Sequence, residues 1–313
     1  MFGYLLRRLA LGVLLLFVVT TLAFVLVFSG GPGIARRILG PLASPADVQA
    51  MTEKLGLDQP VLSQYFGWLG SALRGDLGTS WFTSEPVTGA IASRLPVTFS
   101  IIIIVIVISA VLSVLLGMAA AVQRGWADRL VQVLAIVGYA VPGFIIAMLL
   151  VTVFAVNLTL FPATGFVPFA DDPMGWAMSL ALPVAALVLS TVASTAQQIR
   201  SSLIDVLRRD YVRTLRSRGL GESEILWKHV LRSASPPGLT VLSLQFIGLV
   251  GGTVIVEQVF SLPGLGYLAV QSTTRGDIPV ILGVVVVTVL LVVIVNFVID
   301  LVIAWLNPKA RLS

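Results

Sequence analysis

The sequence contains no cysteine and only one histidine among its 313 residues. The chain therefore has no disulfide, no thiolate nucleophile and no cysteine ligands for a metal, and one histidine cannot form a histidine cluster. It also lacks the G-x-x-x-x-G-K-[ST] pattern that cradles nucleotide phosphates. We therefore expect no thiol chemistry, no cysteine or histidine-rich metal site and no nucleotide site of this kind on the chain.

Charged residues are also scarce. They make up 11% of the chain, whereas an average soluble domain carries about 25%. Apolar residues make up 57%, a composition typical of a membrane protein. The formal net charge of +5 is spread thinly over this apolar chain, so it favours a cytoplasmic-face bias over nucleic acid as a partner.

Long apolar runs are what the sequence has in abundance. A helix needs about 20 apolar residues to cross the hydrocarbon, and we predict an all-α membrane protein with six such helices. The predicted spans are Leu9–Phe28, Val97–Val122, Leu130–Val156, Trp176–Ile199, Gly238–Val256 and Pro279–Leu306. Gly138, Pro142 and Gly143 are expected to kink the third span. The first run is too long for a signal peptide and no A-x-A site follows it, so we expect it to be retained.

The distribution of charge predicts the orientation. With the N-terminus in the cytoplasm, the inside segments hold 14 of the 20 Lys and Arg residues against five acidic residues. The outside segments hold six basic residues against nine acidic ones. This bias follows the positive-inside rule, so both termini are expected to be cytoplasmic.

The outside segment between the first two spans, residues 29–96, is too long to be a simple turn. Ser44 followed by Pro45 is typical of a helix start. A second helix is indicated by an apolar stripe at helical spacing, made of Leu62, Phe66, Leu69 and Leu73. From the pattern alone, this segment lies either on the membrane surface or on the helix bundle, or it forms a docking surface for an extracytoplasmic partner.

The predicted inner loop, residues 200–236, concentrates eight basic residues. Apolar residues recur every four positions and predict one helix face, formed by Leu203, Leu207, Tyr211 and Leu215. Gly219 and Gly221 are expected to break this helix, and a second helix is expected to begin near Glu222. The positive-inside rule accounts for part of the charge, but it does not account for two helices joined at a glycine corner.

These residues resemble a known family. Gly219, the preceding "YVRTLRSR" and the following "ILWKHVL" are similar to the cytoplasmic EAA loop of bacterial ABC-importer permeases. The likeness is greatest to the first permease subunit of the dipeptide/oligopeptide/nickel subfamily, and it extends over nearly the whole chain. Other blocks in the family's order are "LRGDLGTSWFTSEPVTGAIASRLPVTFS", "FPATG" and "IVEQVFSLPGLGYLAVQSTTRGDIPV". The three EAA positions read Arg213, Thr214 and Leu215 here, and the Pro-Gly-Asp-Pro run of the family is replaced by "SGGPGIA".

The resemblance implies a type I ABC importer permease fold with an extracytoplasmic insertion between helices 1 and 2. It divides the chain into a first helix with its extracytoplasmic region, 1–96, and a five-helix core, 97–306, with a coupling loop at 200–236. The implied partners in the bacterial inner membrane are lipid and a second permease subunit. Two ATP-binding subunits that hold ATP and Mg²⁺, and an extracytoplasmic peptide-binding protein, complete the implied complex. The resemblance thus implies that this chain is not an enzyme and carries no catalytic, cofactor-binding or metal-binding residue.

The resemblance also implies site residues. The short helix before Gly219 would lie in a groove of the ATPase, and the residues expected to couple the two proteins are Tyr211, Val212, Arg213, Leu215, Arg216, Gly219 and Glu222. For the translocation pathway the sequence offers two candidates, Gln245 in the middle of the fifth span and Glu257 at its outer end. Glu257 is alternatively a helix-end residue or an ion-pair partner of Arg275.

The substrate is left open by the sequence. The resemblance favours import of dipeptides or short oligopeptides, with nickel and glutathione as alternatives. A secondary transporter or channel is the rival class, but such proteins typically show inverted repeats or charged residues near the membrane midplane. A membrane protein without a transport role is the third class considered.

Overall fold

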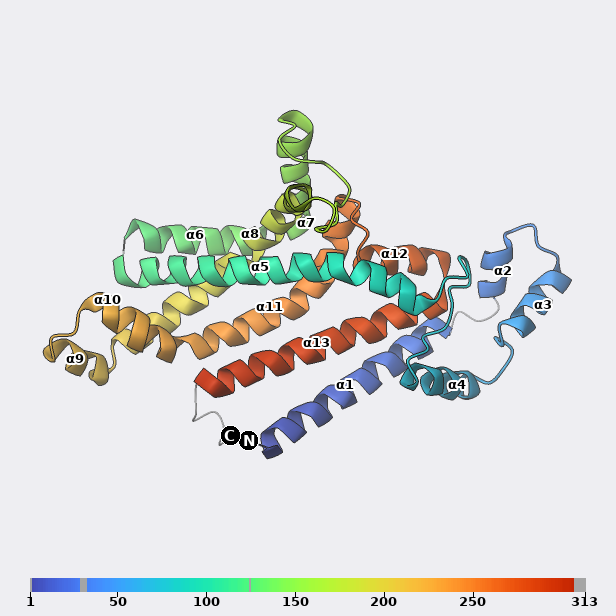
Figure 1. Ribbon diagram of the computed structural model, residues 1–313, viewed down its shortest axis with the longest axis horizontal. Coiled ribbons are helices and arrows are strands. Elements are labelled where there is room, and N and C mark those ends of the chain that lie inside the picture. Colours follow the sequence, from blue (N-terminus) through green and yellow to red (C-terminus); the bar gives the residue numbers. More distant parts are fainter. Residues whose placement is uncertain (1, 29–32, 124, 307–313) are drawn as a thin grey trace. The chain divides into compact units, whose positions relative to one another are not determined.

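The computed structural model describes residues 2–28, 33–123 and 125–306, and within these ranges the only β-structure is an isolated bridge between Thr79 and Pro86. The protein is therefore helical, as predicted (Figure 1). The chain divides into two compact units. We call residues 2–98 with 263–294 the α1 unit, and residues 99–262 with those from 295 onward the α8 unit.

The α1 unit contains the first long helix and a group of short ones. Its elements are α1 (Phe2–Phe28), α2 (Gly33–Leu39), α3 (Pro45–Lys54), α4 (Val61–Leu73), the start of α5 (Val87–Gln123), α12 (Leu265–Arg275) and most of α13 (Ile278–Leu306). The predicted start of α3 is confirmed: Pro45 is the first helical residue, and the Ser44 hydroxyl accepts a hydrogen bond from the Asp47 amide. The helix predicted around Leu62 and Phe66 is α4.

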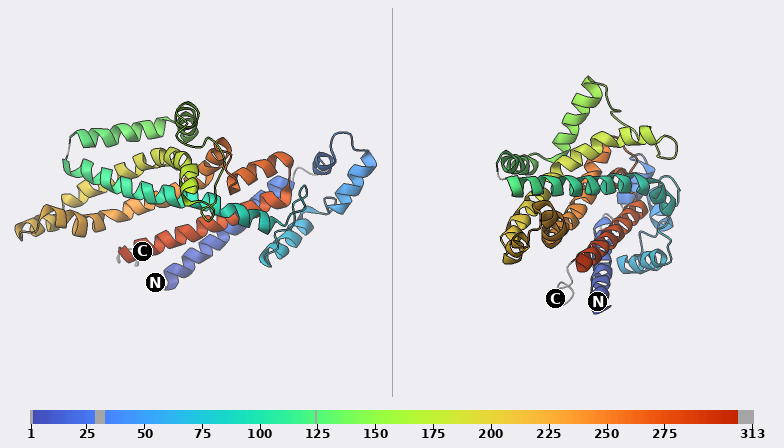
Figure 2. Two further views of the ribbon diagram at one scale, coloured as in Figure 1. Left: turned by 45° about the horizontal axis from the view of Figure 1, so that its top comes forward. Right: turned by 60° about the vertical axis from the view of Figure 1, so that its left-hand side comes forward.

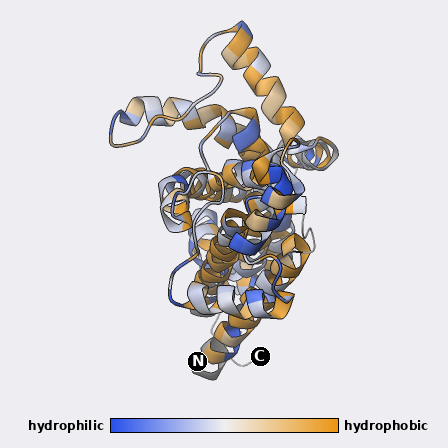
Figure 3. Cartoon of the chain, turned by 90° about the vertical axis from the view of Figure 1, so that its right-hand side faces the viewer, coloured by the Kyte–Doolittle hydropathy of each residue, from blue (hydrophilic) through white to orange (hydrophobic). Residues whose placement is uncertain are grey.

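The α8 unit holds the rest of α5 and the central helices. Its elements are α6 (Trp126–Ala140), α7 (Gly143–Leu150), the π-helical turn η1 (Val151–Asn157), α8 (Pro173–Leu207), α9 (Asp210–Ser217), α10 (Glu222–Glu224), the π-helical turn η2 (Ile225–Val230) and α11 (Leu231–Val259). Within this unit α8 packs mainly against α11, α6 and α7 (Figures 1 and 2). Apolar residues dominate the long helices, as the hydropathy colouring shows (Figure 3).

Five helices of the described chain are long and apolar enough to cross a membrane. They fall at the first, second, fourth, fifth and sixth predicted spans, and most extend several residues further than predicted. The helices can continue into flanking segments because the backbone hydrogen bonds within a helix do not require a hydrocarbon surrounding.

The third predicted span is not one long helix, so the prediction of six membrane-crossing helices is not confirmed. The chain leaves the helical conformation at Pro142, whose ψ of 137° is extended, and α7 begins at Gly143. Proline has no amide hydrogen to donate and disfavours helical geometry in the residue before it, so α6 ends at Ala140. The expected kink is therefore a complete break between two short helices, α6 and α7.

The prediction for the first helix of the inner loop needs a correction. The four-residue recurrence from Leu203 to Leu215 suggested one continuous helix face, but α8 ends at Leu207 and α9 begins at Asp210. Between them Arg209 has an extended conformation, with φ −72° and ψ 146°. Leu203 and Leu215 therefore belong to different helices. The second helix begins at Glu222 as predicted, but the chain stays helical through η2 and α11 as far as Val259.

Candidate functional site

The glycine corner that ends α9 has a backbone conformation that requires glycine. Gly219 has φ +82°, in the left-handed region where a side chain costs energy. Its amide donates to the Arg216 carbonyl at 2.9 Å, and the Leu220 amide donates to the Leu215 carbonyl at 3.3 Å. These bonds satisfy carbonyl groups at the end of the helix. Gly221 is different, because its φ of −69° is open to any residue.

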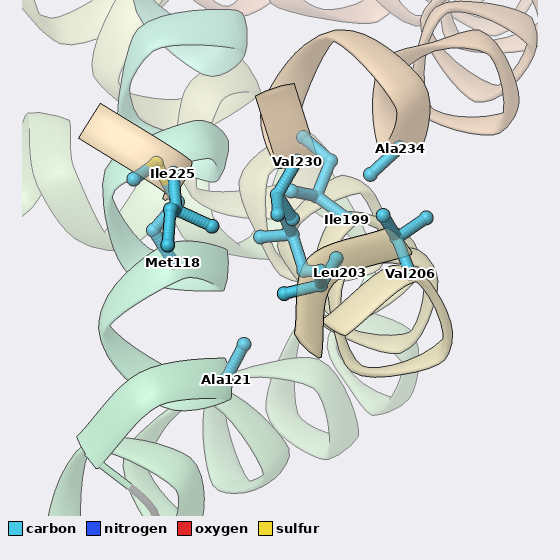
Figure 4. Close-up of a cluster of buried hydrophobic side chains, with 9 residues drawn as sticks. Met118, Ala121, Ile199, Leu203, Val206, Ile225, Val230 and Ala234 are labelled. Carbon is cyan, nitrogen blue, oxygen red and sulfur yellow. The ribbon is translucent and has the colours of Figure 1, made fainter. Parts of the chain in front are cut away.

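A cluster of buried apolar side chains holds α9 in place. Val212 is the only fully buried residue of α9, and it packs in a cluster to which α5, α8, η2 and α11 contribute. In Figure 4 the Met118 and Ile225 side chains lie next to each other, while Val230 lies beside Ile199 and Leu203. We expected Val212 to form part of the outward coupling face, and this was wrong: its side chain is enclosed by the chain itself and anchors the helix.

An ion pair closes the corner on its other side. The Arg216 guanidinium donates to both carboxylate oxygens of Glu222, at 2.6 and 3.1 Å. The pair spans Gly219 and links α9 to α10. Hydrogen bonding to Glu222 raises the pKa of the Arg216 side chain, so the guanidinium stays charged. Both side chains are substantially exposed to solvent, so the pair adds alignment to the corner more than stability.

The outward face of α9 is basic, with one aromatic residue. Tyr211 is 37% exposed, and Arg213 and Arg218 are exposed. Arg213 makes only a loose contact with Asp210, at 3.6 Å, with both side chains largely in solvent. Leu215 is half-buried and packs against the edge of the buried cluster. The result is a short helix that is anchored by Val212 and exposes an aromatic ring and guanidinium groups.

Sequence reasoning missed one residue near this face. Trp227, in the turn η2, is 52% exposed although it is among the largest apolar side chains of the loop. In the sequence it stands only within the block "ILWKHVL". Its spacing gives no signal, because Trp227 is three residues from the buried Val230 and would share its face in an α-helix. The buried Ile225 and Val230 are five residues apart, a spacing that fits the π-helical turn η2.

The central helices of the α8 unit are joined by polar side chains. Gln245 of α11, the candidate pathway residue, donates a hydrogen bond to the Ser194 hydroxyl of α8 at 2.6 Å. Ser109 of α5 and Thr191 of α8 share a hydrogen bond of 2.6 Å. Such bonds between apolar helices hold the helices together. Gln245 is half-buried.

Glu257, the second pathway candidate, lies in the last turn of α11 and is fully buried. A carboxyl group enclosed in this way is costly to ionise without compensation and is commonly functional. Among the residues that the structure describes, no three His, Cys, Asp or Glu side chains are grouped to hold a metal ion.

A buried carboxylate ties the loop before α5 to the turn before α13, within the α1 unit. The Asp277 carboxylate accepts hydrogen bonds from the Ser80 hydroxyl at 2.5 Å and from the Trp81 amide at 3.1 Å. Ser80 and Asp277 are both nearly inaccessible to solvent. The sequence analysis did not single out this pair, because the two residues are 197 positions apart. Their arrangement fixes the loop that leads into α5.

The chain has several long apolar helices, hydrogen bonds between polar side chains of those helices, and a short basic helix that ends at a glycine corner. These features are typical of an integral membrane protein. Comparison with known proteins gives the family. The model for the binding-protein-dependent transport system inner membrane component matches residues 113–312, and the model for the N-terminal part of such components matches residues 1–102. The chain belongs to this family of inner membrane permeases.

Individual relatives are similar over their full length. A protein of Brucella abortus (strain 2308) named as a peptide transport system permease is 39% identical over 314 residues, which cover 99% of both chains. The glutathione transport system permease protein GsiC of Escherichia coli (strain K12) is 37% identical over 312 residues, again covering 99% of both chains. The resemblance seen in the sequence is thereby confirmed, and the rival class of secondary transporters and channels is set aside.

Proposed function

We propose that this chain is a permease subunit of an ATP-driven importer for dipeptides or short oligopeptides. The observation that carries the proposal is the full-length similarity to permeases named for peptide and for glutathione transport. The first name gives peptides and the second gives glutathione, which is itself a small peptide. Glutathione is therefore the second candidate substrate. Nickel remains the third, supported only by the resemblance to the wider subfamily.

We propose that α9 is the element that couples this chain to an ATPase. A displacement of the ATPase can be transmitted only by a helix that does not yield, and α9 is fixed at three points: Val212, Gly219 and the Arg216–Glu222 pair. Tyr211 and the edge of Leu215 would enter the groove of the ATPase. Arg213 and Arg218 would face acidic groups at its rim and steer the encounter more than they add affinity.

The orientation follows from the same assignment. A coupling helix that meets a cytoplasmic ATPase places the loop between α8 and α11 in the cytoplasm, in agreement with its excess of basic residues. Both termini would then be cytoplasmic, if the segment from α6 to η1 completes one crossing of the membrane. ATP and Mg²⁺ would bind to the ATPase subunits and not to this chain.

The permease would work as half of a pathway, beside a second permease subunit. Gln245 and Glu257 are the pathway residues that we propose, because Gln245 is the amide in the middle of the apolar length of α11 and Glu257 is its one carboxyl group. On the other side of the membrane, the charged helices α2 and α3 would meet a peptide-binding protein, since no residue of α3 is buried.

The test is purification of the tagged chain from its native membrane with its associated proteins. We expect two ATPase subunits and a second permease to co-purify, and a dipeptide or short oligopeptide to be the ligand of the associated binding protein. A matched pair of variants checks the assignment of α9. Arg213→Glu should weaken recovery of the ATPases, because it would set a carboxylate against the acidic rim and add like-charge repulsion. Arg74→Glu, an equal change of charge in the α1 unit, should not. Equal recovery of the ATPases with both variants would contradict the coupling role of α9.

A further inference from the structure

The helix α4 differs from its surroundings because none of its 13 residues is charged. Asp58 precedes it and Arg74 and Asp76 follow it, so the charge-free stretch coincides with the helix. One side of α4 packs onto its own unit through Tyr65, which is buried, and Trp68. This side alone would account for an amphipathic helix resting on a protein surface.

A second apolar side of α4 has no partner in the described chain. Leu62, Phe66 and Leu73 are 70%, 64% and 81% exposed. At about 100° per residue they fall within about 40° of one another around the helix, next to the side that carries Tyr65. The small and polar residues Ser63 and Gly67 lie further round the helix and are also exposed. The helix thus has an aromatic side toward the protein, an exposed apolar stripe and a small, polar side.

The contacts of α4 place it at a defined depth along α1. The Tyr65 hydroxyl is 2.7 Å from the Thr21 hydroxyl, and the Phe24 ring contacts the rings of Tyr65 and Trp68 at centroid distances of 5.2 and 5.6 Å. Thr21 lies seven residues before the end of α1, which is about 10 Å at 1.5 Å per residue. The apolar span of α1 extends to Phe28, so α4 contacts α1 within the apolar length and not beyond it.

We propose that α4 is an interfacial helix whose stripe of Leu62, Phe66 and Leu73 inserts into the acyl chains of the leaflet at the C-terminal end of α1. In Figure 1, α4 lies beside the C-terminal end of α1 and runs at a slant to it. Tyr65 and Trp68 lie where aromatic residues are enriched in membrane proteins, at the boundary between hydrocarbon and water. Helices that lie in this boundary bury an apolar face and keep a polar face toward water, and α4 pairs its apolar stripe with the side that carries Ser63 and Gly67.

Lipid fits the stripe better than a protein partner does. A binding protein that delivers substrate must leave again, and its departure would return three large apolar side chains to water. The charged helices α2 and α3 suit a transient polar contact, whereas α4 does not. The proposal rests on the chain being an integral membrane protein and does not depend on its substrate.

The test uses spin labels on the full chain in lipid bilayers. Because the sequence has no cysteine, each single-cysteine variant carries one label without background. The stripe variants are Leu62→Cys, Phe66→Cys and Leu73→Cys. The matched controls are Ser63→Cys and Gly67→Cys, and a side chain at Gly67 would meet no atom within 4 Å. Collision with oxygen, which concentrates in hydrocarbon, is compared with collision with a water-soluble nickel chelate.

We expect the ratio of oxygen to nickel-chelate collisions to be higher at all three stripe positions than at both controls. Equal ratios at stripe and control positions would overturn the proposal. A second outcome would also overturn the proposal: labels at the stripe positions collide frequently with the nickel chelate, and these collisions stop when the purified binding protein is added. That result would identify a protein as the occupant of the stripe. ATP-driven uptake by the Leu62→Cys variant, measured in the same bilayers, reports separately on the proposed transport function.

Discussion

Replacing Gly219 with alanine tests the rigidity of α9 with a change of a single methyl group. The added Cβ would meet no atom within 4 Å, so any effect comes from the backbone and not from a clash. At φ +82° a residue other than glycine costs about 1–2 kcal/mol. Gly221→Ala is the matched control: its Cβ also meets nothing within 4 Å, but its φ is −69°.

The size of the effect depends on what else holds the corner. Val212 is the one buried anchor of α9, and the exposed Arg216–Glu222 pair adds about 0–1 kcal/mol. A strain of about 1–2 kcal/mol is therefore comparable to the interaction energies that align α9. It changes the ratio of aligned to misaligned chains by a factor of about 5–30. We expect the coupling of ATP hydrolysis to transport to decrease by a factor of about 5–30 in Gly219→Ala. In Gly221→Ala it should stay near the original level.

The assay is ATP hydrolysis stimulated by the loaded binding protein, measured in the reconstituted complex together with uptake. The amount of each variant in the membrane is measured as well, because a misfolded variant would be less abundant and would lose activity for that reason alone. The reasoning is refuted if Gly219→Ala and Gly221→Ala retain the same stimulated hydrolysis and uptake. Gly219→Pro should be more damaging than alanine, because proline fixes φ near −65°.

Three further outcomes follow from the contacts. Exchanging Arg216 and Glu222 in one double variant should restore the coupling that the single variant Arg216→Glu loses; failure of the double variant to recover would show that the pair does not align the corner. Asp277→Ala should destabilise the loop before α5 by about 1–3 kcal/mol, because two buried donors lose their acceptor, and limited proteolysis of membranes should show faster cleavage there. Gln245→Leu, which removes a bond worth about 0.6 kcal/mol between helices, should leave the protein in the membrane but lower its uptake. Unchanged uptake would remove Gln245 from the pathway.

The features that the sequence predicted well depend on local rules. Ser44 and Pro45 are sufficient to start a helix, and apolar runs of 20 or more residues form long helices wherever proline and glycine are absent. The glycine corner was predictable because Gly219 follows directly on a basic, apolar-periodic segment. The helical class and five of the six predicted spans therefore agree with the structure.

The errors arise where local rules compete with packing. Pro142 was expected to bend a helix, but an adjacent glycine removes the resistance to a complete break. The four-residue recurrence of apolar residues continued across Arg209, although the backbone there is extended, so two helices were predicted as one. Val212 was placed on the coupling face by the resemblance, which carries no information about the packing of this side chain. The link between Ser80 and Asp277 joins residues 197 positions apart, and periodicity carries no information over that distance.

The most direct test of the whole account is uptake into proteoliposomes that contain this chain, its partner permease and the ATPases, with the binding protein added outside. The account predicts that a labelled dipeptide or short oligopeptide accumulates inside against its gradient only when the ATPases have ATP and the binding protein is present. Uptake that proceeds without ATP, or that only equalises the two concentrations, would contradict it.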